Sequence, residues 1–150
     1  MKRCDNMKYI HYGHNKFDIS KFEQIKNQPF SSKPSGGFWA SRVDDENSWK
    51  NWVENNEFSF GKFDTSFEFT LNPDAKVLVI DNLEMVDKLP KASQPILQNL
   101  SISHQYIDFE EISKEYDAIE LLISEDFRLY YRFYGWDCNS ILILKPNIVI

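Results

Sequence analysis

The chain has 150 residues, a formal net charge of −6 and four arginines against thirteen lysines. This length fits one domain with its own hydrophobic core, covering residues 1–150. The acidic balance argues against a DNA-reading protein, because nucleic-acid affinity depends largely on a basic face that neutralises phosphates.

The charge is unevenly distributed along the chain. Residues 1–62 carry ten Lys and Arg against eight Asp and Glu, whereas residues 63–150 carry seven against fifteen. An anionic ligand is therefore expected nearer the N-terminal part. Cys4 and Cys138 are too few and too far apart to indicate a disulfide framework, and no apolar run is long enough to span a membrane. With no apolar segment after the basic start, we expect a cytoplasmic protein that does not bind membranes.

The first predicted elements precede residue 60. Residues 8–13 read as a strand that ends at a glycine, residues 17–27 as a short helix or turn, and residues 38–41 as a buried strand. Residues 44–58 have Trp49, Trp52 and Val53 at helical spacing, which predicts a helix whose tryptophans pack into the core.

The stretch KPSGGFWASR contains the strand at residues 38–41. The Lys33-Pro34 pair favours an extended backbone, and Gly36 and Gly37 permit backbone angles or close approaches that other residues cannot adopt. We therefore interpret the glycine pair as a hinge that leads into the strand.

The rest of the chain alternates between predicted strands and short helices. Alternating or continuous apolar residues predict strands, with Trp136 packing a turn near the end, and Asp108 and Glu111 have the spacing of a helix capping box. The predicted strands are 63–71, 76–80, 117–123, 127–134 and 140–145, and the predicted helices are 82–89, 95–100 and 108–116. The resulting fold class is α+β, a compact mixed β-sheet with several short flanking helices.

The common nucleotide-binding and zinc-protease motifs are absent from the sequence. His11 and His14 lie three residues apart but have no obvious third ligand, so no metal is expected. A hydrolase triad of Ser41, His11 and Glu120 is possible on paper, but no nucleophile-elbow motif accompanies it.

Three short motifs in a particular order carry more information. The order is His11-Tyr12-Gly13 at the end of the first strand, then GGFWAS, then Glu120 inside a later strand. This order resembles the ADP-ribosyltransferase superfamily, whose split sheet places a His or Arg on the first strand, a Tyr or Ser near the second and a Glu on a later strand. The resemblance extends over most of the chain in outline.

The resemblance implies a protein that uses NAD as a substrate and breaks the bond between nicotinamide and ribose. Glu120 would stabilise the ribosyl cation that forms, because a carboxylate favours developing positive charge. Ser41 would brace this glutamate, and His11 would hold the adenosine side of NAD.

The resemblance also assigns residues to the binding of NAD. Backbone groups beside Gly13 would hold the carboxamide, Trp39 or Tyr12 would stack on the nicotinamide ring, and Lys33 and Arg42 would be available for the phosphates. The NAD-binding residues are therefore predicted to be Tyr12, Gly13, Lys33, Gly37, Trp39 and Arg42.

Three sequence features bear on these assignments. Tyr12 separates His11 from the glycine, where families with an "HG" signature have the two side by side. Ala118 stands where arginine-modifying members have a second Glu or Gln, so arginine is not the expected acceptor. Glu125 and Asp126 are rival carboxylates, but Glu120 is preferred because its strand neighbours would hold it rigidly.

The predicted function is a mono-ADP-ribosyltransferase-like enzyme that transfers ADP-ribose to a macromolecular acceptor, either protein or nucleic acid. Its small size is compatible with a toxin, an effector or a phage-encoded modifier. Two alternatives remain open: an NAD glycohydrolase, in which water is the acceptor, and a catalytically silent acidic protein that binds and inhibits a basic partner.

Overall fold

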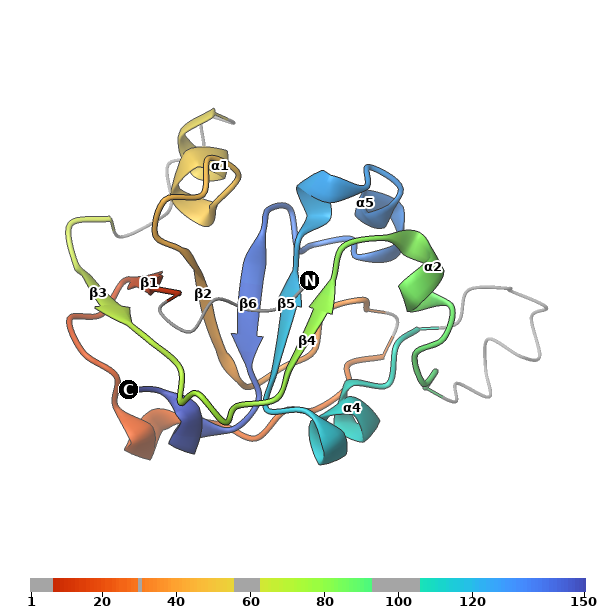
Figure 1. The fold of residues 1–150 in the computed structure, drawn as a ribbon, viewed down its shortest axis with the longest axis horizontal. Helices are drawn as coiled ribbons and strands as arrows, with labels where there is room; N and C mark the ends of the chain where they lie inside the picture. The colour runs from red at the N-terminus through yellow and green to blue at the C-terminus, as the bar shows by residue number, and fades with distance from the viewer. Residues whose placement is uncertain (1–6, 30, 56–62, 93–105) are drawn as a thin grey trace.

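The computed structural model describes residues 7–29, 31–55, 63–92 and 106–150 (Figure 1). The helix predicted at residues 95–100 lies outside the described residues, as does Cys4. The other predicted elements can be compared with the structure directly.

A mixed six-stranded sheet forms the centre of the fold, in the order β3-β1-β2-β6-β5-β4. Strands β4 and β5 are parallel and every other neighbouring pair is antiparallel. The strands are β1 (Tyr9–Tyr12), β2 (Phe38–Arg42), β3 (Ser66–Phe69), β4 (Val77–Ile80), β5 (Ala118–Leu121) and β6 (Ser140–Ile143). The sheet and its short helices confirm a compact α+β fold.

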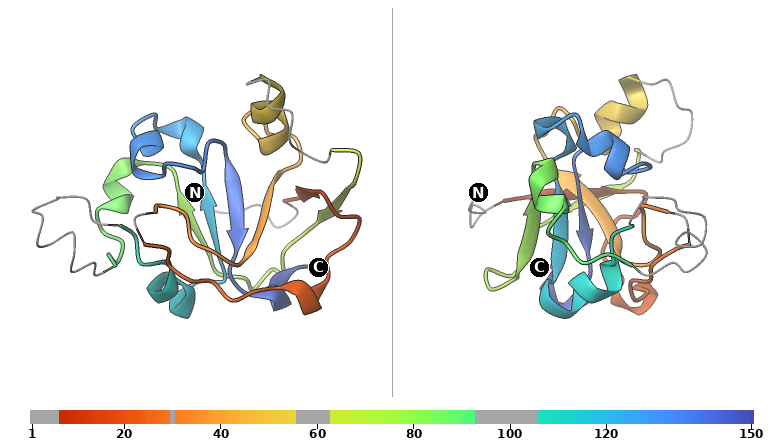
Figure 2. Two further views of the ribbon diagram at one scale, coloured as in Figure 1. Left: turned by 180° about the vertical axis from the view of Figure 1, so that it is seen from behind. Right: turned by 90° about the vertical axis from the view of Figure 1, so that its right-hand side faces the viewer.

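Short helices lie at the two ends of the strands (Figures 1 and 2). One end carries α1 (Trp49–Asn55), α2 (Leu83–Val86) and α5 (Leu129–Arg132), and the other carries α4 (Phe109–Glu115). Three 3-10 turns complete the described elements: η1 (Ile19–Lys21), η2 (Ile123–Glu125) and η3 (Pro146–Ile148). At the start of α4 the Asp108 carboxylate accepts a hydrogen bond from the Glu111 N–H at 3.0 Å, as the capping pattern predicted.

Alternation along the strands divides the core into two clusters, one on each face of the sheet. On β5, Ile119 and Leu121 pack beneath α2, α4 and α5, whereas Ala118 faces the other cluster, with Tyr9 of β1. The register places Glu120 on the same face as Ala118. The neighbours of Glu120 therefore point to the opposite side, as expected from the sequence.

The sheet opens between β1 and β2. Strand β1 pairs with β3 along four residues but with β2 only at Tyr9–Arg42 and Ile10–Ser41. Beyond these pairs the two strands separate, and Gly13 donates its N–H to the carbonyl of Thr65 instead. The opening lies at the C-terminal end of β1 and the N-terminal end of β2.

Two predicted elements differ from the structure. The strand predicted at 127–134 is wrong, because this segment contains α5. Leu129 and Phe133 are buried and lie four residues apart, a spacing close to the helical period. The exposed aromatic residues around them are of a type enriched in strands, which explains the wrong prediction. The helix predicted at 44–58 begins at Trp49, after a turn that precedes it.

A membrane-crossing helix would need roughly 20 mostly apolar residues. No helix in the described parts of the chain has the necessary length and apolar character.

Candidate functional site

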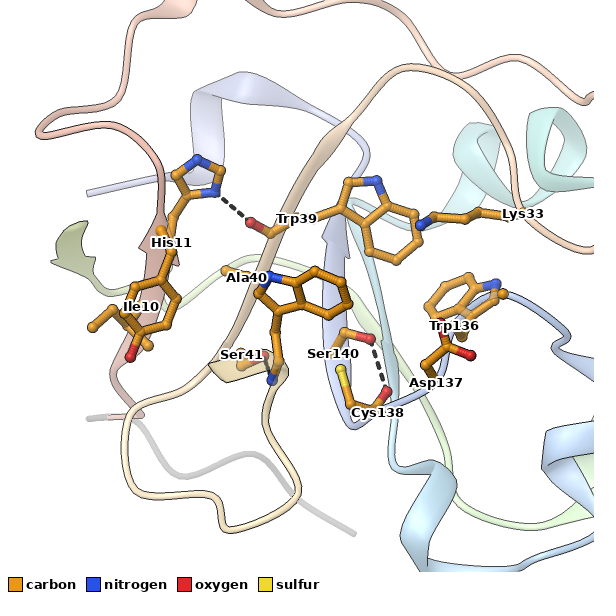
Figure 3. Close-up of a pocket in the computed structure, with 13 residues that line it drawn as sticks. Ile10, His11, Lys33, Trp39, Ala40, Ser41, Trp136, Asp137, Cys138 and Ser140 are labelled. Carbon is orange, nitrogen blue, oxygen red and sulfur yellow. Dashed lines mark hydrogen bonds between the residues drawn. The ribbon is translucent and has the colours of Figure 1, made fainter. Parts of the chain in front are cut away.

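A cavity of about 260 Å³ opens where β1, β2 and β6 meet the loop that precedes β6 (Figure 3). We call it the aromatic pocket, because three of the four tryptophans of the chain contribute to its wall. Its lining comprises Ile10, His11, Tyr12, Lys33, Trp39, Ala40, Ser41, Trp49, Gly135, Trp136, Asp137, Cys138 and Ser140.

Two tryptophans and a lysine form one side of this pocket. The rings of Trp39 and Trp136 meet edge to face, with centroids 4.7 Å apart and planes at 76°. The Nζ atom of Lys33 lies 4.8 Å from the centroid of the Trp39 ring, within the range of a cation–π contact (Figure 3). The pocket therefore presents aromatic faces together with a positive charge.

The loop before β6 is fixed by Trp136. This side chain is buried and donates its indole N–H to the carbonyl of Ser32 at 2.9 Å. The next residue, Asp137, has a φ of 59° and is spanned by a 2.6 Å hydrogen bond from Cys138 N–H to the Trp136 carbonyl. This combination is typical of the rare γ-turn with a positive φ at its centre. Such strain persists where surrounding contacts impose it, and it is often found at binding sites.

Ser41 holds Trp49 against the pocket. Its hydroxyl donates to the carbonyl of Asn139 at 3.2 Å and accepts a hydrogen bond from the N–H of Trp49 at 3.3 Å. The serine thus ties the start of α1 to the residue before β6, and in this structure it does not contact Glu120.

A second cavity, of about 600 Å³, lies at the opening between β1 and β2. We call it the histidine pocket. It shares His11 and Trp39 with the aromatic pocket, so the two cavities adjoin. Its other lining residues are Gly13, His14, Asn15, Lys16, Phe17, Asp18, Lys21, Phe22, Gly37, Phe38 and Thr65.

The His11 ring fills the space between the separating strands. Its Nδ1 lies 2.6 Å from the Trp39 carbonyl, so this nitrogen carries a proton and donates it. Its Nε2 then accepts a hydrogen bond from Nδ1 of His14 at 2.9 Å. The ring also stacks on Phe38 with centroids 4.3 Å apart. Burial lowers the pKa of His11, and the nearby His14 lowers it further against the raising effect of the Trp39 carbonyl.

Acidification should therefore destabilise the protein through His11. Because its pKa is lowered in the folded state, the unfolded chain binds more protons once the pH falls below about 6.5. The melting temperature should fall between pH about 7 and pH about 5. His11→Asn keeps a donor for the Trp39 carbonyl but does not titrate, so its melting temperature should fall less over this range. Equal pH dependence in the two proteins would contradict the prediction.

Glu120 lines neither pocket and lies on the face of the sheet opposite the side chains of Trp39 and Ser41. It is 2% exposed, and both of its carboxylate oxygens accept hydrogen bonds from Arg42 at 2.8 Å. The hydroxyl of Tyr9 donates to the same carboxylate at 3.4 Å. The hydrogen bonds from Arg42 to Glu120 raise the pKa of the guanidinium, which remains charged.

The structure therefore gathers seven of the nine residues predicted for the site around the two adjoining pockets: His11, Tyr12, Gly13, Lys33, Gly37, Trp39 and Ser41. It places the other two, Glu120 and Arg42, together as an ion pair outside both pockets, on the face opposite the side chains of Trp39 and Ser41. The rival carboxylates also lie elsewhere: Asp126 is bonded to Arg128 and the Leu83 N–H, and Glu125 lines a separate surface hollow with Arg42.

Among the lining residues of the aromatic pocket that were not predicted from the sequence, Trp49, Trp136 and Asp137 contribute most to its chemistry. The tryptophans were interpreted as packing residues, a role that a pocket wall and a core share. Asp137 belongs to no recognisable sequence motif. Its positive φ distinguishes it from the other pocket residues, and this angle is known only from the structure.

The pocket has limited nucleophilic chemistry of its own. Cys138 lines it, but burial raises the pKa of this thiol to about 12, so it remains protonated and unreactive near neutral pH. Among the described residues, no group of three or more His, Cys, Asp and Glu side chains is placed to hold a metal ion.

Comparison with known proteins gives no assignment: no family model matches the chain, and neither the curated proteins nor the solved structures contain a match.

Proposed function

We propose that the two adjoining pockets bind NAD and that the protein is an ADP-ribosyltransferase-like enzyme that transfers ADP-ribose to a macromolecular acceptor. The observation that supports this proposal is the convergence of His11, Tyr12, Gly13, Lys33, Gly37, Trp39 and Ser41 on these pockets. The residues come from two segments that are separated in sequence: β1 with the glycine after it, and β2 with the loop before it.

The dimensions of the pockets suit the two parts of a dinucleotide. At about 260 Å³ the aromatic pocket is smaller than the roughly 300–1,000 Å³ typical of sites for drug-sized ligands, so it fits a single ring such as nicotinamide. The larger histidine pocket would take the remainder of NAD, with Lys16 and Lys21 in its lining available to the phosphates.

The proposed reaction is a substitution at the ribose C1′ atom of NAD. The bond from C1′ to the ring nitrogen breaks, and its electron pair neutralises the positive charge of the ring, which leaves as nicotinamide. An acceptor atom forms the new bond to C1′ and loses its proton to solvent. A rigid aromatic wall would favour this step by holding the leaving ring in one orientation.

A first test measures nicotinamide release and NAD binding by the purified protein. We expect the wild type to release nicotinamide, and Trp39→Leu to weaken NAD binding by about tenfold, because the substitution keeps apolar bulk but removes the stacking face. Phe127→Leu is the matched control, since Phe127 is exposed, lines neither pocket and should leave NAD affinity unchanged.

A second test uses NAD that carries an isotope label in its adenosine part, and the molecule to which the label becomes attached is the acceptor. Label attached to protein or RNA supports a transferase, whereas release of free ADP-ribose indicates that water is the acceptor. Absence of nicotinamide release and of NAD binding in the folded wild type would overturn the proposal.

A further inference from the structure

We propose that the aromatic pocket is a cage for a planar organic cation, that Lys33 occupies this cage when no ligand is bound, and that Asp137 supplies its negative charge. The inference rests on the proposed function in one respect: the pyridinium ring of NAD is a cation of this kind. It also applies to any ligand with such a ring, and this allows the two proposals to fail separately.

The structure already contains a cation in the pocket. The ammonium of Lys33 lies 4.8 Å from the centre of the Trp39 ring, and Trp136 stands nearly perpendicular to that ring. The Lys33 ammonium approaches a face of the Trp39 ring, and indole is the aromatic ring that attracts cations most strongly. Trp136 is buried and also packs on Phe109 and Phe133, so it forms a rigid wall of the cage. The Lys33 ammonium thus marks the position that a ligand cation would take.

Asp137 lines the same pocket and carries a negative charge. It lines the cavity next to Trp136, and no hydrogen bond or ion pair to this carboxylate is found within the described ranges. Lys33 lines the cavity too but does not form an ion pair with it, so each charge is available to a ligand. The strained backbone at Asp137, with φ at 59°, fixes the start of the side chain in the pocket wall.

Exchange of the lysine for a ligand cation leaves the total charge of the pocket unchanged. The two ions differ in hydration, however. An ammonium is compact and strongly hydrated, so it gains solvation when it leaves the cage, whereas a delocalised cationic ring loses less hydration on entering. The exchange therefore favours the planar cation inside and Lys33 outside, where the ammonium can approach the phosphates of NAD.

A calorimetric titration with 1-methylnicotinamide, a cation, and nicotinamide, its neutral counterpart, tests this inference. The wild type should bind the cation about tenfold more tightly than the neutral ring. Asp137→Asn should abolish most of this preference by weakening cation binding about tenfold, with little change for nicotinamide. Asparagine tolerates a positive φ as aspartate does, so the turn should survive the substitution.

Two further variants complete the design. Asp44→Asn removes the same charge at a residue outside the pocket and should leave both affinities unchanged. Lys33→Met removes the resident ammonium and should strengthen binding of 1-methylnicotinamide about threefold. Equal wild-type affinities for the two rings would overturn the inference, as would identical behaviour of Asp137→Asn and Asp44→Asn, or weaker cation binding by Lys33→Met.

The two proposals give different patterns of failure. Nicotinamide release without any preference for the cation would contradict the cation cage and still support the proposed function. Selective binding of 1-methylnicotinamide without cleavage of NAD would contradict the proposed function and still support the cation cage.

Discussion

Replacing Arg42 by alanine should lower the free energy of unfolding by about 3 kcal/mol or more, because it leaves the carboxylate of Glu120 buried without its partner. The carboxylate is 2% exposed, and its two oxygens accept their shortest hydrogen bonds from Arg42 at 2.8 Å. The Tyr9 hydroxyl, at 3.4 Å, is too distant to compensate. Chemical denaturation of the wild type and the variant measures the difference.

An exposed ion pair and a double variant serve as controls. Lys114→Ala breaks the pair with Glu111, in which both side chains are largely exposed, and should change the free energy of unfolding far less, because water screens an exposed pair. Replacing both partners, Arg42→Met with Glu120→Leu, should recover much of the stability lost in Arg42→Ala, since no unpaired charge stays buried. An effect of Arg42→Ala as small as that of Lys114→Ala would contradict the prediction.

The same pair bears on the role of Glu120 in the proposed reaction. The resemblance implies that Glu120→Gln abolishes NAD turnover with the fold retained. The structure gives Glu120 a structural contact outside both pockets, and from this contact we expect Glu120→Gln to lower thermal stability. Activity and melting temperature measured on one sample distinguish the two roles: lost turnover at an unchanged melting temperature supports the catalytic assignment.

The second large effect is expected for Gly37→Val. At this position φ is +73°, which β-branched residues rarely adopt, and an added Cβ would lie 2.7 Å from Leu142 Cδ1 and 2.9 Å from the Ile143 carbonyl. The collision with backbone cannot be relieved by a side-chain rotation. We expect a loss of about 3 kcal/mol or more in the free energy of unfolding, together with weaker NAD binding, because Gly37 lines the histidine pocket.

Gly13→Val is the matched control for stability. Gly13 also has a positive φ, +105°, but nothing lies within 4 Å of an added Cβ. The difference between the two variants in urea denaturation isolates the collision from the conformational cost. Equal losses would show that the close packing of Gly37 against β6 contributes little.

Much of the sheet could be predicted from the sequence because its strands have strong apolar patterns. The segment KVLVI contains β4 and the segment SILIL contains β6. Core residues cover at least one face of each strand. The segment FRLYYRFY could not be assigned correctly. Its aromatic residues favour strands in composition, and only the burial of Leu129 and Phe133 reveals a helical period.

The candidate site was predictable where neighbours in sequence remain neighbours in space. The stretch KPSGGFWASR supplies Lys33, Gly37, Trp39 and Ser41 to the two pockets. The side chains at successive strand positions, however, alternate between faces, so Trp39 and Ser41 point away from Arg42. The sequence order of the motifs does not reveal which face each side chain takes, and this is why Glu120 and the aromatic pocket lie on opposite sides of the sheet.

The bridge between Arg42 and Glu120 also constrains how such a sequence can diverge. The arginine of β2 reaches over β6 to the glutamate of β5, so the two ends of the bridge lie on strands that are not neighbours. A change at one end alone leaves a charge without compensation, whereas a joint change to two apolar residues does not. In homologous chains we therefore expect these two positions to covary, so that the arginine and the glutamate are either both retained or both replaced. The surrounding apolar positions should vary independently of one another.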